Sequence, residues 1–246
     1  MNLRYVLDGP SPAPVLVLPS SLGTSIDLWE ANLSHWPSFR VLRYDQPGHD
    51  SIDGLGQDLL RLLDVLELER VSVCGLSLGG ATAMWFAANA GERLERLVLA
   101  CTSATFGEPR PWFERAALVR TGGLEPIADS ILANWFTASF AVANSETVAR
   151  FRALLTDTPP ERYARCCDAI ARWDFAEQLA EIRAPTLVIA AAEDPSTPRE
   201  HAELIAARID GAKLAVLPHA AHLANVEQPE AFAALVSEHV ASVEVA

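Results

Sequence analysis

The chain has 246 residues, of which 50% are hydrophobic, and a formal net charge of −13 at pH 7. This length fits one large α/β domain with an extensive core, or at most two modest domains. The sequence contains a single lysine and no basic run, which argues against nucleic acids and anionic membranes as partners, because both bind clustered lysine and arginine.

The first predicted strands are separated by loops rich in small residues. Residues 3–7 and 15–18 are apolar runs joined by a turn-rich connection, and we expect them to form a hairpin whose second strand is fully buried. That strand leads into the small-residue loop 19–24. A loop of this kind after a central strand leaves a backbone N–H free, so Leu22 is a candidate oxyanion donor. An ordinary loop is the alternative.

A third strand is predicted at residues 39–44 and ends in a segment that contains His49. A catalytic base is one interpretation of this histidine. The Asp-x-x-Gly-His pattern is more typical of a structural turn in which the imidazole binds backbone groups. Leucines then recur at helical spacing through residues 52–68, and this amphipathic helix leads to the next strand as part of a βαβ unit.

A G-x-S-x-G pentapeptide, Gly75 to Gly79, lies between a buried strand and a helix predicted at residues 78–90. Such an elbow turns so sharply that the positions flanking the nucleophile must be nearly bare. Ser77 would project its hydroxyl over the sheet edge, with the N–H of Leu78 aimed at any oxyanion formed there. Because a short motif also arises by chance in glycine-rich turns, its partners decide its meaning.

After a strand predicted at residues 96–101, the alternation of strands and helices stops. Residues 105–174 have no strand pattern and consist of predicted helices punctuated by proline and glycine, in the place where a lid would be inserted. This segment carries eight arginines against nine acidic residues, so the rest of the chain holds about −12 of the net charge. The predicted lid is therefore the least repulsive surface for an anionic substrate.

The alternation resumes with strands at residues 186–191 and 213–217, each followed by a helix, and the last helix spans residues 229–243. Asp194 comes just after the first of these strands, and His222 follows the second. A carboxylate and a histidine therefore follow successive strands, as an acid and a base of one active site would.

Serine is a weak nucleophile until a base removes its proton and a carboxylate orients that base. The chain order Ser77, Asp194, His222 is that of α/β-hydrolases and differs from the order in other serine hydrolase folds. Glu193 is a rival for the acid, but the residue that turns away before a proline is better placed to point across the site. His219 is a rival for the base, but it lies beside the strand end, whereas His222 lies in the loop before the last helix.

We therefore predict an α/β-hydrolase fold, with a mostly parallel, doubly wound sheet and a helical lid inserted before the last strands. In this division, residues 1–104 and 175–246 form the core, and residues 105–174 form the lid. The nucleophile, the acid and the base would meet where the strands end.

The four cysteines show no metal-ligand spacing. Cys74 and Cys101 lie in predicted strands, and Cys166 and Cys167 are adjacent, which suits reduced thiols better than disulfides. No leader segment precedes the first predicted strand, and no run of 18 apolar residues occurs. We therefore expect a soluble, cytoplasmic protein.

Several segments point to one family within the α/β-hydrolases. They are the loop SSLGT at residues 20–24, the elbow GLSLGG, the stretch that begins NWFT at residue 134, the pair Cys166-Cys167, and AAHLANVEQPE at residues 220–230. Together these segments resemble 3-oxoadipate enol-lactonases, and the resemblance covers nearly the whole chain. The WFT stretch and the last segment are specific to that family, whereas the triad is shared across α/β-hydrolases.

The resemblance implies hydrolysis of the enol-lactone of the β-ketoadipate pathway of aromatic degradation, a five-membered ring with a free carboxylate. Ser77 would attack the lactone carbonyl while His222 takes its proton, and the N–H groups of Leu22 and Leu78 would hold the oxyanion. The expelled enolate becomes a ketone, and water activated by His222 then releases 3-oxoadipate. No metal or organic cofactor is implied, because the enol is already a good leaving group.

Two departures from the family concern the pocket. The family usually has an arginine immediately before the lid tryptophan, where this chain has Asn134 before Trp135, both expected to contact substrate. The loop that contains His49 also differs in sequence and is followed by a shorter connection. Another arginine of the lid would then have to bind the substrate carboxylate. The candidates are Arg110, Arg115, Arg162 and Arg165.

Two other functions stay open at this point. One is a carboxylesterase, another lactonase or a perhydrolase-type enzyme, whose altered lid accepts a neutral ester. The other is a non-catalytic binding protein of the same fold. Such proteins usually have a broken triad, whereas all three members are present in this sequence.

Overall fold

The computed structural model describes residues 3–241 of the chain. Within them, seven strands form one sheet in the order β1-β3-β2-β4-β5-β6-β7, in which neighbours are parallel except for the antiparallel pair of β1 and β3. The strands span Tyr5–Asp8 (β1), Val15–Pro19 (β2), Arg40–Tyr44 (β3), Val71–Leu76 (β4), Leu94–Ala100 (β5), Thr186–Ala191 (β6) and Lys213–Leu217 (β7).

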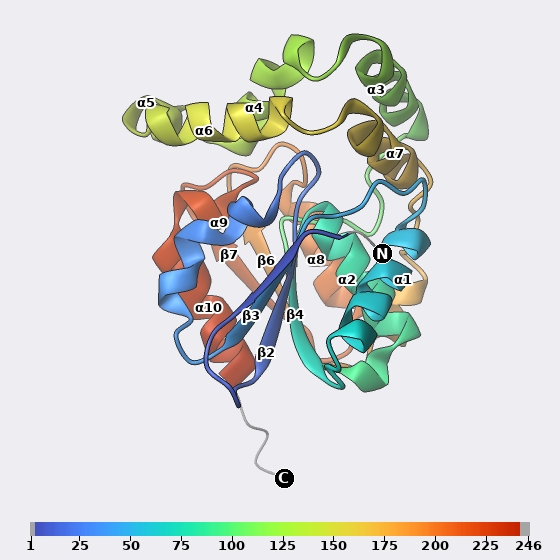
Figure 1. The fold of residues 1–246 in the computed structure, drawn as a ribbon, viewed down its shortest axis with the longest axis vertical. Helices are drawn as coiled ribbons and strands as arrows, with labels where there is room; N and C mark the ends of the chain where they lie inside the picture. The colour runs from blue at the N-terminus through green and yellow to red at the C-terminus, as the bar shows by residue number, and fades with distance from the viewer. Residues whose placement is uncertain (1–2, 242–246) are drawn as a thin grey trace.

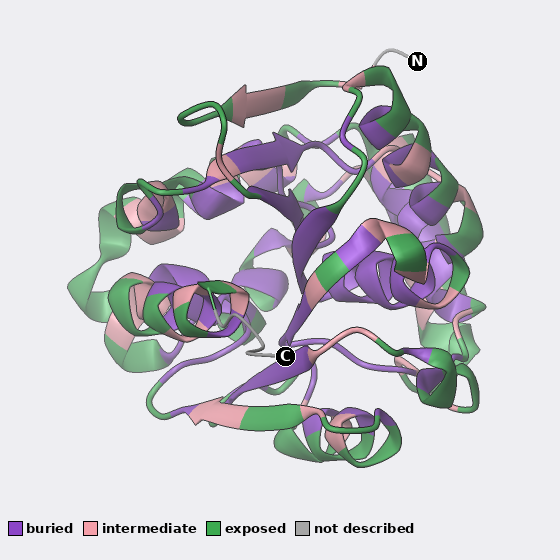
Figure 2. Cartoon of the chain, turned by 90° about the horizontal axis from the view of Figure 1, so that it is seen from below, coloured by how far each residue is buried: buried purple, intermediate pink, exposed green. Residues whose placement is uncertain are grey.

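The middle of the sheet is buried on both faces. Every residue of β2, β4 and β6 is buried, as expected for apolar runs that form the interior of a parallel sheet. Figure 2 shows the contrast with the two edges, where β1 and β7 carry intermediate and exposed residues. The site described below lies at the carboxyl ends of the buried strands.

Helices cover both faces of the sheet (Figure 1). On one face lie α1 (Ile52–Val65), α2 (Leu78–Asn89) and α8 (Arg199–Arg208), and on the other lie α10 (Pro229–Ala241) and the 3-10 helix η1 (Ile26–His35). The shorter elements are α9 (Ala224–Glu227), η2 (Gly91–Arg93) and η4 (Gln178–Glu181). The predicted end of the last helix at Val243 lies outside the described residues.

The predicted opening hairpin is wrong. β1 pairs with β3, from Tyr5 opposite Tyr44 to Asp8 opposite Val41, and β3 separates it from β2. The physical reason is burial: β2 is apolar at every position and takes an interior place, whereas β1 keeps Tyr5 and Asp8 exposed and suits the edge.

Residues 105–174, here called the helical insertion, form five α-helices that lie across the carboxyl ends of the strands (Figure 1). Its two ends meet beneath these helices, because Thr105 forms an isolated antiparallel bridge with Asp174, and the N–H of Phe175 donates to the carbonyl of Ala104 (2.9 Å). The helices are α3 (Pro109–Gly122), α4 (Ala128–Trp135), α5 (Ala138–Ala143), α6 (Ser145–Thr156) and α7 (Pro160–Ala171), with the 3-10 turn η3 (Glu125–Ile127) before α4.

Two sequence-based expectations concern the whole molecule. All four cysteines are buried free thiols, as predicted from their positions. Over residues 3–241, the helices are too short or too polar to cross a membrane.

Candidate active site

Ser77 lies at the junction of β4 and α2 in a strained conformation, with φ 58° and ψ −116°. A residue with a side chain rarely adopts a positive φ, so surrounding contacts must hold it there. The N–H of Ser77 donates to the carbonyl of Ala100 (3.0 Å), and its carbonyl accepts from the hydroxyl of Thr102 (2.7 Å). These hydrogen bonds to the end of β5 fix the predicted nucleophile at the carboxyl ends of the strands.

The glycines that flank Ser77 are required by close backbone approaches. A Cβ atom on Gly75 would lie 2.2 Å from the carbonyl oxygen of Gly79, and one on Gly79 would lie 2.1 Å from that of Pro19. The second contact brings the end of β2, and with it the loop 19–24, against the start of α2. The absence of a side chain at Gly79 therefore lets the two predicted oxyanion donors approach each other.

Replacing Gly79 with alanine is expected to destabilise the chain by about 3 kcal/mol, because the new methyl group overlaps the rigid backbone at Pro19. Chemical denaturation measures this loss of unfolding free energy. Gly91→Ala is the matched control, since no atom lies within 4 Å of its added Cβ, and its effect should stay within about 0.5 kcal/mol. Equal stability of the two variants would contradict the role given to the Gly79 contact.

His222 and Asp194 form a buried pair. The Nδ1 atom of His222 lies 2.8 Å from Oδ2 of Asp194, and the two residues are 4% and 5% exposed. Asp194 also accepts bonds from the hydroxyl of Thr197 (2.7 Å) and from the N–H groups of Ser196 (2.8 Å) and Thr197 (3.1 Å). Each oxygen of the carboxylate therefore has two hydrogen-bond partners.

These contacts determine the charge of Asp194 and the tautomer of His222. Burial by itself would raise the pKa of the Asp194 carboxyl, but the charge of His222 and the hydrogen bonds from His222 and Thr197 outweigh it, so the pKa lies below its ordinary value. Because a carboxylate only accepts hydrogen bonds, the neutral form of His222 carries its proton on Nδ1 and has its lone pair on Nε2.

The two rival residues lie outside this pair. The Nδ1 atom of His219 lies 3.6 Å from Oε1 of Glu193, and both side chains are more than half exposed. His49 is also separate, because its Nε2 atom lies 2.7 Å from Oδ2 of Asp58. We expected the imidazole of His49 to bind backbone groups. This expectation is wrong, because its partner is the carboxylate of Asp58 on α1.

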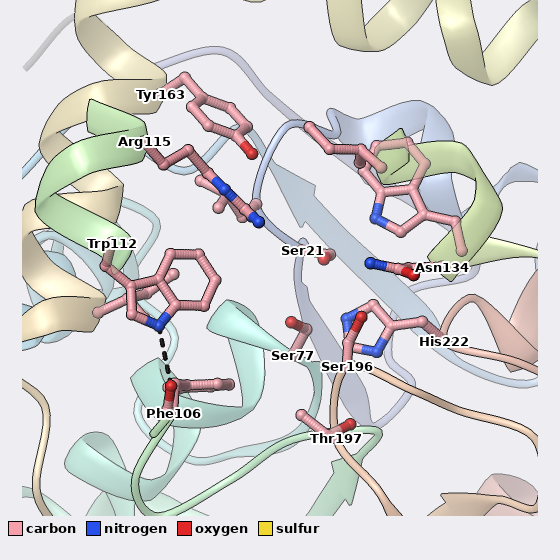
Figure 3. A pocket seen from close by; sticks show the side chains of 14 residues that line it. Ser21, Ser77, Phe106, Trp112, Arg115, Asn134, Tyr163, Ser196, Thr197 and His222 are labelled. Atoms are coloured by element: carbon pink, nitrogen blue, oxygen red, sulfur yellow. Dashed lines mark hydrogen bonds between the residues drawn. The ribbon is translucent and has the colours of Figure 1, made fainter. Parts of the chain in front are cut away.

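A cavity lies between the carboxyl ends of the strands and the helical insertion. Figure 3 shows Ser77 and His222 on its floor, with side chains of the insertion around them. The lining residues are Ser21, Leu22, Ser77, Phe106, Trp112, Arg115, Ile131, Asn134, Trp135, Tyr163, Ile170, Ser196, Thr197 and His222.

The predicted oxyanion donors lie beside Ser77. Leu22 lines the cavity, and Leu22 and Leu78 together border a smaller hollow next to it. The loop bends at this point, because the N–H of Thr24 donates to the carbonyl of Ser21 (3.2 Å). Leu78 is the first residue of α2, where N–H groups have no acceptor within the helix.

Asn134 and Trp135, at the end of α4, both line the cavity from above. Trp135 is buried and packs edge-on against Phe151, with 6.4 Å between ring centroids. Asn134 is exposed, and Figure 3 shows its amide directed toward Ser21 and His222. The structure thus brings both predicted substrate contacts to the same cavity as Ser77 and His222.

Glu227 connects the helical insertion to the loop that carries His222, a role that sequence reasoning missed. Its carboxylate accepts bonds from the N–H of Ala221 (3.0 Å) and from the N–H (3.0 Å) and hydroxyl (2.8 Å) of Thr137. The N–H of Leu223 donates to the carbonyl of Trp135 (3.0 Å). Both neighbours of His222 are therefore tied to the insertion. The only signal was the place of Glu227 within AAHLANVEQPE.

Glu227→Gln is expected to lower kcat about 10-fold, because a glutamine has one acceptor oxygen for three donors and the imidazole of His222 loses its fixed position. Steady-state kinetics measures the change, and KM should move less than kcat. Glu230→Gln, at an exposed position in the first turn of α10, is the matched control and should behave as wild type. Unchanged kcat in Glu227→Gln would show that the tie does not position His222.

Comparisons with known proteins agree with this architecture. Residues 15–235 match the family model described as alpha/beta hydrolase family. The 3-oxoadipate enol-lactonase 2 of Acinetobacter baylyi is 38% identical, over 94% of this chain and 90% of that protein. The enol-lactonase from Burkholderia xenovorans, whose crystal structure is known, has 35% sequence identity to this chain. The two structures align with a TM-score of 0.95, over 98% of this chain and 96% of that one.

A hydrolase from Pseudomonas aeruginosa with a known crystal structure has 43% sequence identity to this chain. The two structures align with a TM-score of 0.94, over 98% of this chain and 94% of that one. The predicted fold class is thereby confirmed, as is the resemblance to 3-oxoadipate enol-lactonases that the motifs indicate. The chain therefore belongs to the alpha/beta hydrolase family.

Proposed function

We propose that the chain is a serine hydrolase that opens 3-oxoadipate enol-lactone to 3-oxoadipate through an acyl-serine intermediate, with Ser77, His222 and Asp194 as its catalytic triad. One observation carries this proposal: Ser77 and His222 share a single cavity with Asn134 and Trp135, at the start of a stretch that resembles the enol-lactonases. Relatives named 3-oxoadipate enol-lactonase match nearly the whole chain.

The geometry supports the following steps. Nε2 of His222 takes the proton of the Ser77 hydroxyl, and the serine oxygen bonds to the lactone carbonyl carbon. The N–H groups of Leu22 and Leu78 donate to the oxygen that becomes negative. Collapse breaks the ring C–O bond, the imidazolium of His222 gives its proton to the leaving enolate oxygen, and the resulting enol tautomerises to the ketone.

The second half of the reaction regenerates the enzyme. Water gives a proton to Nε2 of His222, its oxygen attacks the acyl carbon, and the bond to Ser77 breaks as the serine recovers its proton. Asp194 stays ionised and hydrogen-bonded to Nδ1, so it stabilises the imidazolium in both halves. We propose that the helical insertion acts as a lid that holds the ring over Ser77 and limits water.

A direct assay separates the open alternatives. Purified protein is mixed with 3-oxoadipate enol-lactone, with neutral p-nitrophenyl esters and with a fluorophosphonate that labels reactive serines. The proposal expects fast lactone hydrolysis and labelling of Ser77. Turnover of the neutral esters without any of the lactone would favour a carboxylesterase. Failure of both turnover and labelling would favour a non-catalytic binding protein.

A further inference from the structure

The cavity contains one permanently charged side chain, Arg115 of α3. Its other lining residues within the described chain are apolar or neutral polar groups, together with the titratable His222 and Tyr163. Figure 3 shows the guanidinium of Arg115 pointing across the cavity toward the side on which Ser77 and Ser21 lie. A ligand that reaches Ser77 therefore has a cation facing it.

Most arginines of the helical insertion are already neutralised. Each of the following has a carboxylate within 4.0 Å: Arg110, Arg120, Arg150, Arg152 and Arg162. Across residues 3–241, no carboxylate lies within that distance of Arg115. Arg165 lines neither the cavity nor the smaller hollow, whereas Arg162 borders the smaller hollow and lies 3.7 Å from the carboxylate of Asp45.

Neighbouring side chains hold Arg115 without cancelling its charge. Its Cζ atom lies 4.8 Å from the ring centroid of Trp112, whose indole N–H donates to the carbonyl of Phe106 (2.8 Å). The hydroxyl of the buried Tyr163 lies beside the guanidinium (Figure 3). Stacking on an aromatic ring fixes a guanidinium and leaves its N–H groups in one plane available to a bidentate acceptor.

We infer that Arg115 binds the free carboxylate of the substrate, so that this site prefers small lactones and esters whose acyl part ends in a carboxylate. Asn134 cannot supply this charge, because its amide is neutral and exposed. A planar carboxylate matches the guanidinium fork with two parallel hydrogen bonds. This inference rests on the proposed function, because it concerns a substrate whose carbonyl group is attacked by Ser77. Arg115 would bind the carboxylate at the opposite end of that substrate.

The test uses two esters of equal chain length that differ in charge. The half ester mono-p-nitrophenyl adipate carries a free carboxylate, and p-nitrophenyl hexanoate does not. Arg115→Gln is expected to lower kcat/KM for the half ester about 10- to 100-fold, the usual loss for a charge-assisted pair, and to leave the hexanoate within about 3-fold. Arg115→Lys should recover part of the loss, because it keeps the charge without the fork.

Arg110→Gln is the matched control, because it removes the same charge from the same helix at a side chain that is 86% exposed. It should leave the preference between the two esters unchanged. Circular dichroism and phosphonate labelling of Ser77 verify that each variant is folded with a reactive serine. An Arg115→Gln variant that loses both esters equally, or that keeps the wild-type preference for the half ester, would overturn the inference.

The readouts keep this inference separate from the proposed function. A wild-type protein that does not hydrolyse the enol-lactone but shows an Arg115-dependent preference for the half ester would refute the proposed lactone substrate. It would still support the binding of a carboxylate by Arg115. A wild-type protein that hydrolyses the enol-lactone, with kcat/KM unchanged in Arg115→Gln, would refute the anchor and leave the lactone function standing.

Discussion

Ser77→Ala is expected to lower kcat on the enol-lactone by about 10⁵-fold or more, the size of effect seen when a triad serine is removed. Alanine has no hydroxyl to attack the carbonyl, and water would have to react in a cavity shaped around the serine oxygen. The elbow should persist, because its flanking glycines and the bonds from Ser77 to Ala100 and Thr102 involve only backbone atoms at position 77.

Steady-state kinetics and a phosphonate probe check this result together. Ser130→Ala is the matched control, because Ser130 is an exposed serine of α4 whose hydroxyl donates to the carbonyl of Ile127. It should retain wild-type turnover and labelling. Robust turnover in Ser77→Ala would refute a serine mechanism, whatever the substrate.

Asp194→Asn is expected to lower kcat by about 10⁴-fold. The amide of asparagine can donate to Nδ1 of His222 (2.8 Å from the carboxylate in the structure), which would place the proton of the imidazole on Nε2, the wrong nitrogen for a base. The N–H groups of Ser196 and Thr197 both donate to Oδ1 of Asp194, so they favour keeping the amide oxygen of the asparagine at that position. The amide nitrogen would then face His222.

Glu193→Gln makes the same chemical change at the adjacent residue and is the matched control. Glu193 is more than half exposed and faces His219, not His222. Its variant should keep kcat within about 2-fold, because surface substitutions away from the site have small effects. A large loss in Glu193→Gln together with activity in Asp194→Asn would assign the acid to the rival position.

The fold, and the residues that the structure brings together at the candidate site, could be predicted from the sequence because their signals lie in short segments of the chain. Strand-end positions can be read from apolar runs, and parallel strands place those ends together, so Ser77, Asp194 and His222 could be matched by order alone. The elbow glycines carried the same kind of signal, since a bare position on each side of a serine has a steric cause.

Features set by tertiary packing were not predictable in the same way. β1 and β2 both contain apolar residues. The edge position of β1 beside β3 depends on which strand is more completely buried when the whole sheet forms. Arg115 could not be chosen from four arginines, because its position in the cavity depends on how α3 packs against α7. Glu227 was missed since its partners, Thr137 and Ala221, are on separate segments of the chain.

Rapid mixing followed by acid quenching and mass spectrometry tests the central claim most directly. Ring opening leaves the enol part attached to the acyl part, so an acyl-enzyme made from a lactone carries the whole mass of the substrate. The account predicts a transient adduct of that mass on the peptide that contains Ser77, formed during turnover of 3-oxoadipate enol-lactone. Turnover with no such adduct, or an adduct on another residue, would contradict it.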